Sequence, residues 1–272
     1  MESMRVTTLE RIRLPEMVEL WNRCWQGYYY NMAYTPEHMK FWLELGQVEL
    51  ANSIAIWVHN QIVGFSLLAV KDSDGWVAGT SIDPRYRGKG LFKPLMKAQI
   101  ELAQRLGLAR VYLEVLVQNH AQKVYRSIGF SGIRQLYVYR TASLENAPLS
   151  AITIKPFKEI PLEQYLEKRL QANFIPPWQR RQGYLKRYRN IQALMNANGS
   201  AGIITLRQNN GPILDVWSSN TAGAEEITSM ILKFRKRGFS LLNQPEDWIV
   251  AFLQINGVYA HSRQIEMCLR LE

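Results

Sequence analysis

The chain has 272 residues, of which 47% are hydrophobic and 21% are charged, and its formal net charge is +10. This length is more than one domain usually needs and suits two domains of roughly 130 to 140 residues, with an ordinary soluble composition that excludes a fibrous or low-complexity chain. The positive charge favours anionic partners such as nucleic acid, acidic lipid or nucleotides, without choosing among them.

The two cysteines, Cys24 and Cys268, lie near opposite ends of the chain and have neither metal-ligand spacing nor the pattern of a disulfide framework. Such low cysteine use fits a reducing compartment. The N-terminal residues mix charges without a secretory signal, and no run approaches the roughly 18 apolar residues that a membrane span needs. The sequence therefore predicts a soluble cytoplasmic protein with no metal site and no membrane partner.

Hydrophobic periodicity and turn residues predict the elements of the first half in chain order. Thr35 and Pro36 mark one helix start, as N-cap and first-turn proline. The expected elements are a strand at 5–12, helices at 15–26 and 35–45, a hairpin at 53–58 and 62–70, a strand at 76–83, a helix at 91–106, a strand at 110–117, a helix at 121–128 and a strand at 133–140. Antiparallel strands followed by alternating strands and helices indicate a mixed α/β fold.

The second half repeats part of this order after a segment at 141–151 that lacks hydrophobic period and contains Pro148, where we expect the linker. A Gln-Asn-Asn-Gly turn at 208–211 is a strong hairpin signal. The expected elements are strands at 202–207 and 211–217, a helix at 224–236, a strand at 239–242, a helix at 246–255 and a strand at 264–271. The weak repeat, with a period of about 130 residues, predicts two domains of one fold, at 1–142 and 150–272.

The most informative stretch reads S-I-D-P-R-Y-R-G-K-G-L-F and joins a predicted strand to the helix that follows. Gly88 and Gly90 let the backbone approach an anion closely and adopt conformations closed to other residues. The free N–H groups at the helix start point toward such an anion, and the helix dipole adds to the attraction. Arg85, Arg87 and Lys89 add positive charge. The stretch therefore predicts a pyrophosphate-binding loop.

This loop resembles motif A of the GNAT N-acetyltransferases, Q/R-x-x-G-x-G/A, matched here by Arg85-x-x-Gly88-x-Gly90. The resemblance implies that the backbone amides of the loop hold the pyrophosphate of acetyl-CoA. It also implies that the preceding strand pairs with the pantetheine arm and separates from the strand near Glu114, which leaves a slot for the thioester. The residues that it assigns to cofactor binding in this segment are Ser81, Ile82, Arg85, Arg87, Gly88, Lys89, Gly90, Leu91 and Phe92.

A second segment, at 113–130, is similar to the family pattern L-E-V-x-x-x-N-x-x-A-x-x-L-Y-x-x-x-G-F. In the family the Asn contacts the cofactor arm, and the Tyr hydroxyl protonates the leaving thiolate. These roles would fall on Asn119 and Tyr125. The two residues are one position closer than the family pattern has them, which is roughly 100° of helix rotation, so Gln118 is an alternative to Asn119.

The resemblance implies an acetyl-CoA-dependent N-acetyltransferase in which a primary amine attacks the thioester directly. Backbone N–H groups would polarise the thioester carbonyl, Tyr125 would act as the acid, and Glu114 is the candidate base that takes the proton of the amine. The alternatives are a structural or surface carboxylate for Glu114 and a packed aromatic ring for Tyr125. The acceptor, a small molecule or a peptide, cannot be identified; the loop with Tyr28, Tyr29, Tyr30 and Tyr34 is expected to line its site.

The second copy lacks the pyrophosphate loop, since S-S-N-T-A-G-A at 218–224 has neither an arginine nor G-x-G, and Phe252 stands where the first copy has Tyr125. The runs P-W-Q-R and R-Q-x-E-M resemble the second half of bacterial tandem GNAT proteins. The resemblance implies two tandem GNAT folds, each a mixed, mostly antiparallel, splayed sheet flanked by helices. We expect the second copy to be degenerate, completing the acceptor pocket or mimicking a dimer partner in a monomer or homodimer.

Two other functions remain to be weighed. A non-catalytic GNAT scaffold could sense acyl-CoA or bind RNA, and the segment at 178–189 is basic with interleaved aromatics, a composition that can bind nucleic acid. A solvated helix face with buried aromatics is the favoured interpretation of that segment, so nucleic acid is not the expected partner. A dinucleotide-binding oxidoreductase is disfavoured, because the loop lacks G-x-G-x-x-G spacing and an acidic ribose partner.

Overall fold

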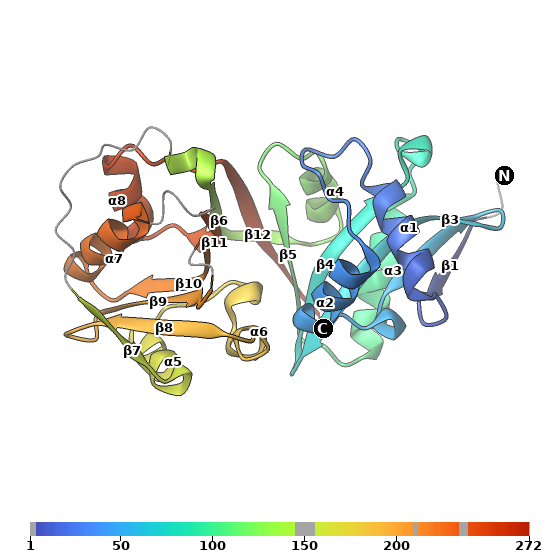
Figure 1. The fold of residues 1–272 in the computed structure, drawn as a ribbon. Coiled ribbons are helices and arrows are strands. Elements are labelled where there is room, and N and C mark those ends of the chain that lie inside the picture. Colours follow the sequence, from blue (N-terminus) through green and yellow to red (C-terminus); the bar gives the residue numbers. More distant parts are fainter. Residues whose placement is uncertain (1–3, 145–155, 209–210, 234–238, 272) are drawn as a thin grey trace. The chain divides into compact units, whose positions relative to one another are not determined.

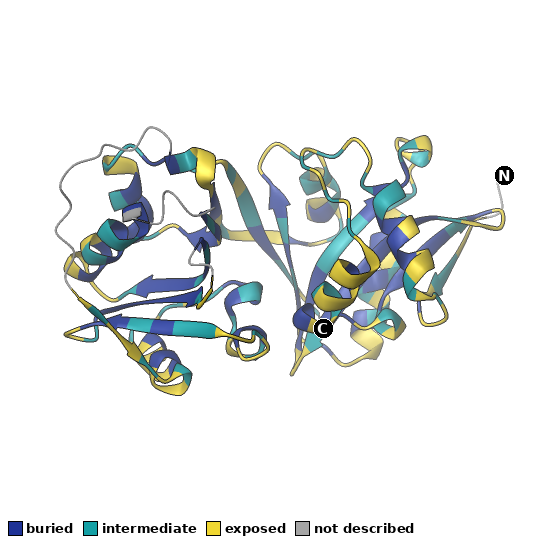
Figure 2. Cartoon of the chain, in the orientation of Figure 1, coloured by how far each residue is buried: buried dark blue, intermediate teal, exposed yellow. Residues whose placement is uncertain are grey.

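The computed structural model describes residues 4–144, 156–208, 211–233 and 239–271. The chain divides into unit 1, which is Met1–Ile133 together with Met267–Glu272, and unit 2, which is Arg134–Glu266 (Figure 1). Each unit has its own buried apolar residues (Figure 2). The two units are described separately below.

Every element predicted in the first half is present, with ends shifted by a few residues, and all of them except most of the last strand lie in unit 1. The elements are β1 (Met4–Thr8), α1 (Leu14–Cys24), α2 (Pro36–Gly46), η1 (Leu50–Asn52), β2 (Ile54–Val58), β3 (Gln61–Lys71), β4 (Asp74–Ile82), η2 (Pro84–Tyr86), α3 (Phe92–Arg105), β5 (Arg110–Leu116), α4 (Ala121–Ser127), the start of β6 (Ser131–Arg140) and the end of β12 (Ser262–Arg270). The caps form as predicted: the Thr35 side chain accepts a hydrogen bond from the His38 N–H at the start of α2.

Strands β1 to β4 of unit 1 are antiparallel neighbours, and β5 lies parallel to β4. Helix α1 packs on the sheet through aromatic rings: Trp21 stacks on Phe65 of β3 with ring centroids 5.5 Å apart. Helix α3 packs through Leu95, which joins an aliphatic cluster with Ile54 and Val63. The aromatic contacts of α1 and the aliphatic contacts of α3 hold the two helices on the sheet beside β4, where the candidate site lies.

The strand beside β5 in unit 1 comes from the C-terminal end of the chain. The Leu271 N–H donates to the carbonyl of Ala109, 2.9 Å away, and the Ser131 hydroxyl donates to the carbonyl of Cys268. The expected domain ranges, 1–142 and 150–272, remain a prediction for the functional domains. The compact units have different bounds, because strand pairing assigns the last residues of the chain to unit 1 and most of β6 to unit 2.

All the elements predicted in the second half are present, and unit 2 contains them except for the end of the last strand, β12. Unit 2 also has elements that the prediction lacked, namely β7, α5, α6 and β8. Its elements are the rest of β6, η3 (Thr141–Leu144), β7 (Phe157–Ile160), α5 (Leu162–Gln171), η4 (Trp178–Arg180), α6 (Gln182–Leu185), β8 (Ile191–Asn196), β9 (Ala201–Leu206), β10 (Pro212–Ser218), α7 (Thr221–Lys233), β11 (Ser240–Pro245) and α8 (Trp248–Ile255). Most of the expected linker and the middle of the expected 208–211 turn lie outside the described residues, although β9 and β10 pair antiparallel as a hairpin requires.

Sheet pairing in unit 2 follows the order β6-β11-β10-β9-β8-β7. Residues 136–140 of β6 pair antiparallel with β11, and β10 and β11 are parallel. The core is built on α7 and α8, with Ile227, Ile231, Ile249 and Leu253 among its buried side chains. The arrangement places a parallel pair of strands in the middle of each unit, β4–β5 in unit 1 and β10–β11 in unit 2.

Candidate functional site

The loop between β4 and α3 has the backbone that its glycines were predicted to allow. Gly88 and Gly90 have φ angles of 76° and 78°, in the left-handed region that other residues rarely adopt. A Cβ atom added at either position would meet nothing within 4 Å, so the requirement for glycine is conformational. Within the described part of the chain, no group accepts a hydrogen bond from the backbone N–H groups of residues 88–91. The loop therefore presents a set of free donors at the start of α3, which suits a pyrophosphate.

Two of the predicted cofactor residues hold the loop in shape with their side chains. Asp83 is 1% exposed and accepts hydrogen bonds from Arg85 at 2.7 Å and Arg23 at 2.9 Å. The hydrogen bonds from Arg85 lower the pKa of the Asp83 carboxyl, with the Arg23 charge adding to the effect. The Arg87 guanidinium donates to the carbonyls of Ile82, Cys24 and Gln26. The charge of these arginines lies beside the loop, but their Nε and Nη2 groups donate to the protein itself.

Lys89 is exposed, as Arg85 and Arg87 are, and its Nζ lies 4.8 Å from the centroid of the Tyr86 ring. Ser81 is buried, and its hydroxyl donates to the carbonyl of Cys24 at 2.7 Å. Ile82 packs in the aliphatic cluster under α3. Ser81 and Ile82 can therefore act toward a cofactor only through their backbone groups.

Strands β4 and β5 separate early, as predicted. Their parallel pairing covers only Asp74–Trp76 of β4 and Arg110–Tyr112 of β5, whereas β4 continues to pair with β3 as far as Ile82. The register of β3 with β4 shifts between Val77 and Gly79, which leaves an extra residue, Ala78, in β4. From Val77 onward the edge of β4 that faces away from β3 has no strand partner among the described residues, so a slot opens between the two strands.

Glu114 lies on β5 just past the last paired residue, where the slot begins. It is half-buried, and its Oε2 accepts a hydrogen bond of 2.7 Å from the indole of Trp76 on β4. The structure thus places the candidate base at the slot and shows what orients its carboxylate.

Tyr125 of α4 lies beside the start of α3. It is 5% exposed, and its ring packs edge-on against Phe92, the first residue of α3, with centroids 5.5 Å apart. Its hydroxyl makes no hydrogen bond with any described residue. Burial raises the pKa of Tyr125, and the nearby Tyr28 phenol adds to this effect. The hydroxyl is therefore protonated at neutral pH and can donate a proton.

Asn119 and Gln118 are the alternatives for a contact with the cofactor arm. Both contact the loop that follows α1 and carries Tyr28, Tyr29 and Tyr30, called the tyrosine loop below. The Asn119 side chain accepts a hydrogen bond of 2.9 Å from the Ala121 N–H. The same side chain is hydrogen-bonded to the Tyr28 hydroxyl. The Tyr29 hydroxyl donates to the Gln118 carbonyl at 3.2 Å. Burial raises the pKa of Tyr28 to about 12. The tyrosine loop therefore closes over the end of β5, a contact that the sequence prediction did not include.

Unit 2 has a corresponding separation of strands, but a side chain fills it. Pairing of β10 with β11 covers only Pro212–Ile213 and Ser240–Leu241. The guanidinium of Arg180, which is 2% exposed, donates to Asp215 and Val216 of β10 and to Gln244 of β11. This arginine is the last residue of the P-W-Q-R run, whose role the sequence did not reveal.

Backbone amides of the loop after β10 also form hydrogen bonds within the protein. The Ser219 N–H donates to the Ser200 carbonyl at 2.8 Å, and the Gly223 N–H donates to the Asn220 side chain at 2.8 Å. A Cβ at Gly223 would lie 2.9 Å from the Ser200 carbonyl oxygen, so the loop packs tightly on the turn before β9. Two of the amides of this loop are therefore already hydrogen-bonded within the protein. Phe252, which replaces Tyr125 here, packs on the core of unit 2.

The basic segment at 178–189 does not form an aromatic binding surface. Trp178, Tyr184 and Leu185 are buried, as is Arg180, while Arg187 is exposed. This matches the favoured interpretation, in which the aromatic rings pack inside and the remaining charges face solvent.

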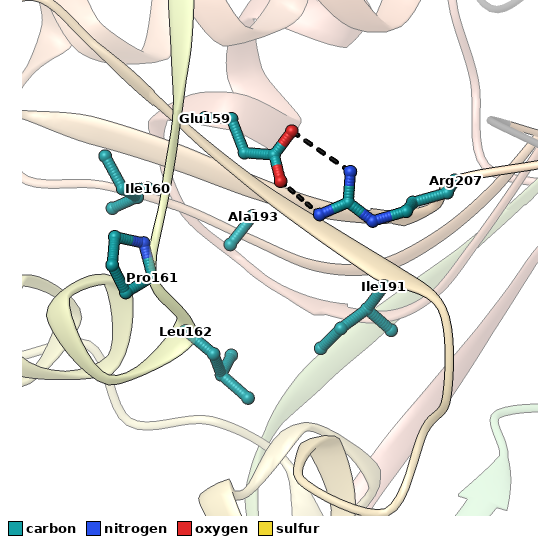
Figure 3. Close-up of a pocket in the computed structure, with 7 residues that line it drawn as sticks. All are labelled: Glu159, Ile160, Pro161, Leu162, Ile191, Ala193 and Arg207. Atoms are coloured by element: carbon teal, nitrogen blue, oxygen red, sulfur yellow. Dashed lines mark hydrogen bonds and ion pairs between the residues drawn. The ribbon is translucent and has the colours of Figure 1, made fainter.

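A hollow of about 500 Å³ lies elsewhere on unit 2, at the start of α5 beside β7 and β8. Figure 3 shows Glu159 and Arg207 facing each other across β8, joined by an ion pair, above the apolar side chains of Leu162 and Ile191. None of the predicted site residues lines this hollow. Its two charges neutralise each other, so it does not resemble an anion site.

Two absences concern only the described part of the chain. No helix there is long and apolar enough to span a membrane. No group of three or more histidine, cysteine, aspartate or glutamate side chains is placed to hold a metal ion.

The sequence profile of the acetyltransferase (GNAT) family matches residues 8–130. A ribosomal protein bS18-alanine N-acetyltransferase of Haemophilus ducreyi is 30% identical over 98 residues, which are 35% of this chain and 68% of that protein. The chain belongs to the GNAT acetyltransferase family. The spermine/spermidine N(1)-acetyltransferase of Bacillus subtilis is 32% identical over 87 residues, 28% of this chain and 57% of that GNAT protein.

The GNAT fold extends over both halves of the chain. A solved GCN5-related N-acetyltransferase from Sphaerobacter thermophilus superposes with a TM-score of 0.65 at 13% identity, covering 98% of this chain and 95% of that one. The predicted fold class, two tandem GNAT folds with mixed and mostly antiparallel sheets, is confirmed. The protein is a GNAT-family N-acetyltransferase, and acetyl-CoA is the acetyl donor of GNAT acetyltransferases.

Proposed function

We propose that unit 1 binds acetyl-CoA and transfers its acetyl group to a primary amine by direct attack. The observation that carries this proposal is the early end of the β4–β5 pairing, after Trp76 and Tyr112. The separated strands leave backbone groups of β4 free for the amides of a pantetheine arm. The free amides of residues 88–91 lie at the start of α3 and suit the pyrophosphate. The loop thus fits the diphosphate and the slot fits the arm.

The residues of the slot have complementary roles in the transfer. The amine nitrogen forms a bond to the thioester carbonyl carbon, and the bond from that carbon to sulfur breaks. Backbone N–H groups of β4 beyond the extra residue Ala78 would stabilise the charge that develops on the carbonyl oxygen. Tyr125, protonated because it is buried, would protonate the departing thiolate. Glu114, oriented by Trp76, remains the candidate base for the proton that the attacking amine must lose.

Direct attack is favoured over an acetyl-enzyme on Cys24. That thiol is buried, and burial raises its pKa to about 12. Since the thiolate is the nucleophilic form, Cys24 would be almost entirely in its unreactive form at neutral pH. The amine itself is therefore the expected nucleophile.

The acceptor is proposed to carry a primary amine, the group shared by the substrates in the names of the two relatives, ribosomal-protein alanine and spermine or spermidine. Unit 2 is proposed to bind no acetyl-CoA, because Arg180 fills the space between its strands and its loop amides are already bonded. This supports a catalytic first copy and a degenerate second copy.

Replacement of Tyr125 by Phe tests the proposal. CoA release from acetyl-CoA would be followed with a panel of primary amines, and we expect kcat to fall by about 10²- to 10⁴-fold, the usual range for loss of a general acid. Binding of CoA, measured by calorimetry, should not change. Tyr139→Phe is the matched control, since Tyr139 is also buried with an unpaired hydroxyl but lies in unit 2.

Unchanged turnover in Tyr125→Phe would remove Tyr125 from the mechanism. If calorimetry detected no binding of acetyl-CoA to the wild-type protein, the catalytic proposal would fail altogether. A salt-sensitive shift of RNA in a gel, together with that result, would favour the non-catalytic scaffold instead.

A further inference from the structure

The slot between β4 and β5 has a closed end, where the two strands are still paired. The last pair joins Trp76 of β4 to Tyr112 of β5. Just past this pair the indole N–H of Trp76 donates a hydrogen bond of 2.7 Å to Oε2 of Glu114 on β5. The two side chains thus connect the strands at the point where their backbones begin to separate. This contact, called the strand bridge below, covers the closed end on one face of the sheet.

Apolar side chains lie at the same level on the other face of the sheet. Successive side chains of a strand point to opposite faces, so Val77 and Leu113 point away from the face that carries the strand bridge. Both of these side chains are buried. An acyl group that enters the closed end between the strands therefore meets side chains on both faces.

The length of a pantetheine arm brings its thioester to this closed end. The Arg87 guanidinium donates to the Ile82 carbonyl at 3.0 Å, which ties the loop that is proposed to hold the pyrophosphate to the last residue of β4. From Ile82 back to Val77 the strand spans about 17 Å at its usual rise per residue. The arm has as many bonds between diphosphate and sulfur as roughly four residues of extended backbone, which is about 14 Å. The sulfur therefore comes within about one residue of the closed end, and the acyl group extends into it.

The Trp76 indole is held against moving aside for a longer acyl chain. It is 3% exposed, and it packs against the end of α2, where a Cβ at Gly46 would lie 3.7 Å from its Cζ3 atom. Turning the ring would also break the hydrogen bond to Glu114, and buried polar groups that lose such a bond are destabilising. The strand bridge is therefore a fixed wall of the slot.

We propose that Trp76 is a specificity-determining residue for the acyl donor, whose indole limits the acyl group to acetyl and excludes propionyl and longer groups. This inference rests on the proposed function and names the residue that selects the donor at the same site. The selection comes from packing, because a further methylene has no space between the strand bridge and the buried side chains on the other face.

Calorimetry with acetyl-CoA, propionyl-CoA and unacylated CoA tests the inference on the full chain and needs no acceptor amine. The wild type should bind propionyl-CoA about 10- to 200-fold more weakly than acetyl-CoA, the usual effect of one methylene in a packed site. Trp76→Phe has a smaller ring, and Glu114→Ala removes the other member of the strand bridge. In both variants the affinities for the two thioesters should become nearly equal.

Trp57→Phe is the matched control. Trp57 lies on β2, and its indole N–H also donates to a side chain of the neighbouring strand, Thr7 of β1, at 2.9 Å. Its replacement should leave the ratio of the two affinities at the wild-type value. Unacylated CoA, measured with every variant, shows whether the cofactor site is still folded. An equal change of the ratio in Trp57→Phe and Trp76→Phe would mean that the sheet is loosened in general, and it would contradict the inference.

Two results overturn the inference. One is a wild type that binds propionyl-CoA as tightly as acetyl-CoA, a result that needs no variant. The other is a ratio that stays at the wild-type value in a folded Trp76→Phe or Glu114→Ala variant. In both cases acetyl-CoA still binds, so the proposed function survives this failure. If acetyl-CoA does not bind the wild type at all, the proposed function fails and the inference fails with it.

Discussion

Replacement of Gly90 by alanine would test whether the loop after β4 binds the pyrophosphate through its backbone. Gly90 has a φ of 78°, and a Cβ there would meet no atom within 4 Å. The substitution therefore creates no clash and acts only on the backbone conformation. An alanine in the left-handed region costs about 1–2 kcal/mol, so the loop either keeps its shape at that cost in stability or turns its amide away.

The expected effect on binding follows from the amide that moves. A hydrogen bond to a charged group contributes about 1.5–3 kcal/mol, which corresponds to a loss of CoA affinity of about 10- to 150-fold. Isothermal calorimetry with CoA would measure this loss. Pantetheine, which lacks the pyrophosphate, would bind Gly90→Ala and the wild type equally.

Gly107→Ala is the control that separates binding from stability. Gly107 follows α3 with a φ of 71°, and a Cβ there would also meet nothing within 4 Å. The two variants should lose the same stability, about 1–2 kcal/mol in denaturant unfolding, while only Gly90→Ala loses affinity for CoA. Equal CoA affinities for the two variants would refute the assignment of the loop to the pyrophosphate.

Two further predictions concern buried charges. Arg180→Met should lower the unfolding free energy of unit 2 by about 3–5 kcal/mol, because it leaves buried acceptors without their donor; Arg187→Met, an exposed control in the same segment, should change it by less than about 0.5 kcal/mol, and equal losses would contradict the role of Arg180. The pKa of Asp83 is lowered in the folded state by Arg85, so its contribution to stability is present above the unfolded value near 3.9 and is lost as the pH falls through the folded value. Asp83→Asn should therefore reduce the slope of unfolding free energy against pH below about pH 4, and the exposed control Asp72→Asn should leave that slope unchanged.

The loop and the slot could be predicted from sequence because their signals are local. Gly88 and Gly90 occur where the backbone needs positive φ, and the strand before them and the helix after them have clear periods. Tyr125 was predicted because the short helix that carries it and the Gly129-Phe130 pair after it resemble the family pattern, although Tyr125 is one position closer to Asn119 than that pattern has it. The structure places both near the start of α3, where Phe92 contacts Tyr125.

The sequence could not predict that most of β6 belongs to unit 2 and the end of β12 to unit 1. Hydrophobic alternation shows that a segment is a strand but not which strand it pairs with. Residues 136–140 and 267–270 both alternate, yet the first set pairs with β11 and the second lies in unit 1. Helix α5 was missed for another reason. Arg169 lies in its buried face, where it pairs with Asp215, so the helix reads as polar.

The two units solve the same physical problem in different ways. Separated parallel strands leave backbone groups without partners, and such groups need hydrogen bonds when they are buried. In unit 2 the Arg180 guanidinium provides them, donating to the Val216 carbonyl and to side chains on both strands. In unit 1 no side chain of the described residues donates to a carbonyl of residues 77–80 of β4. A ligand in that slot would supply what the arginine supplies in unit 2, so acetyl-CoA should stabilise unit 1 while leaving unit 2 unaffected.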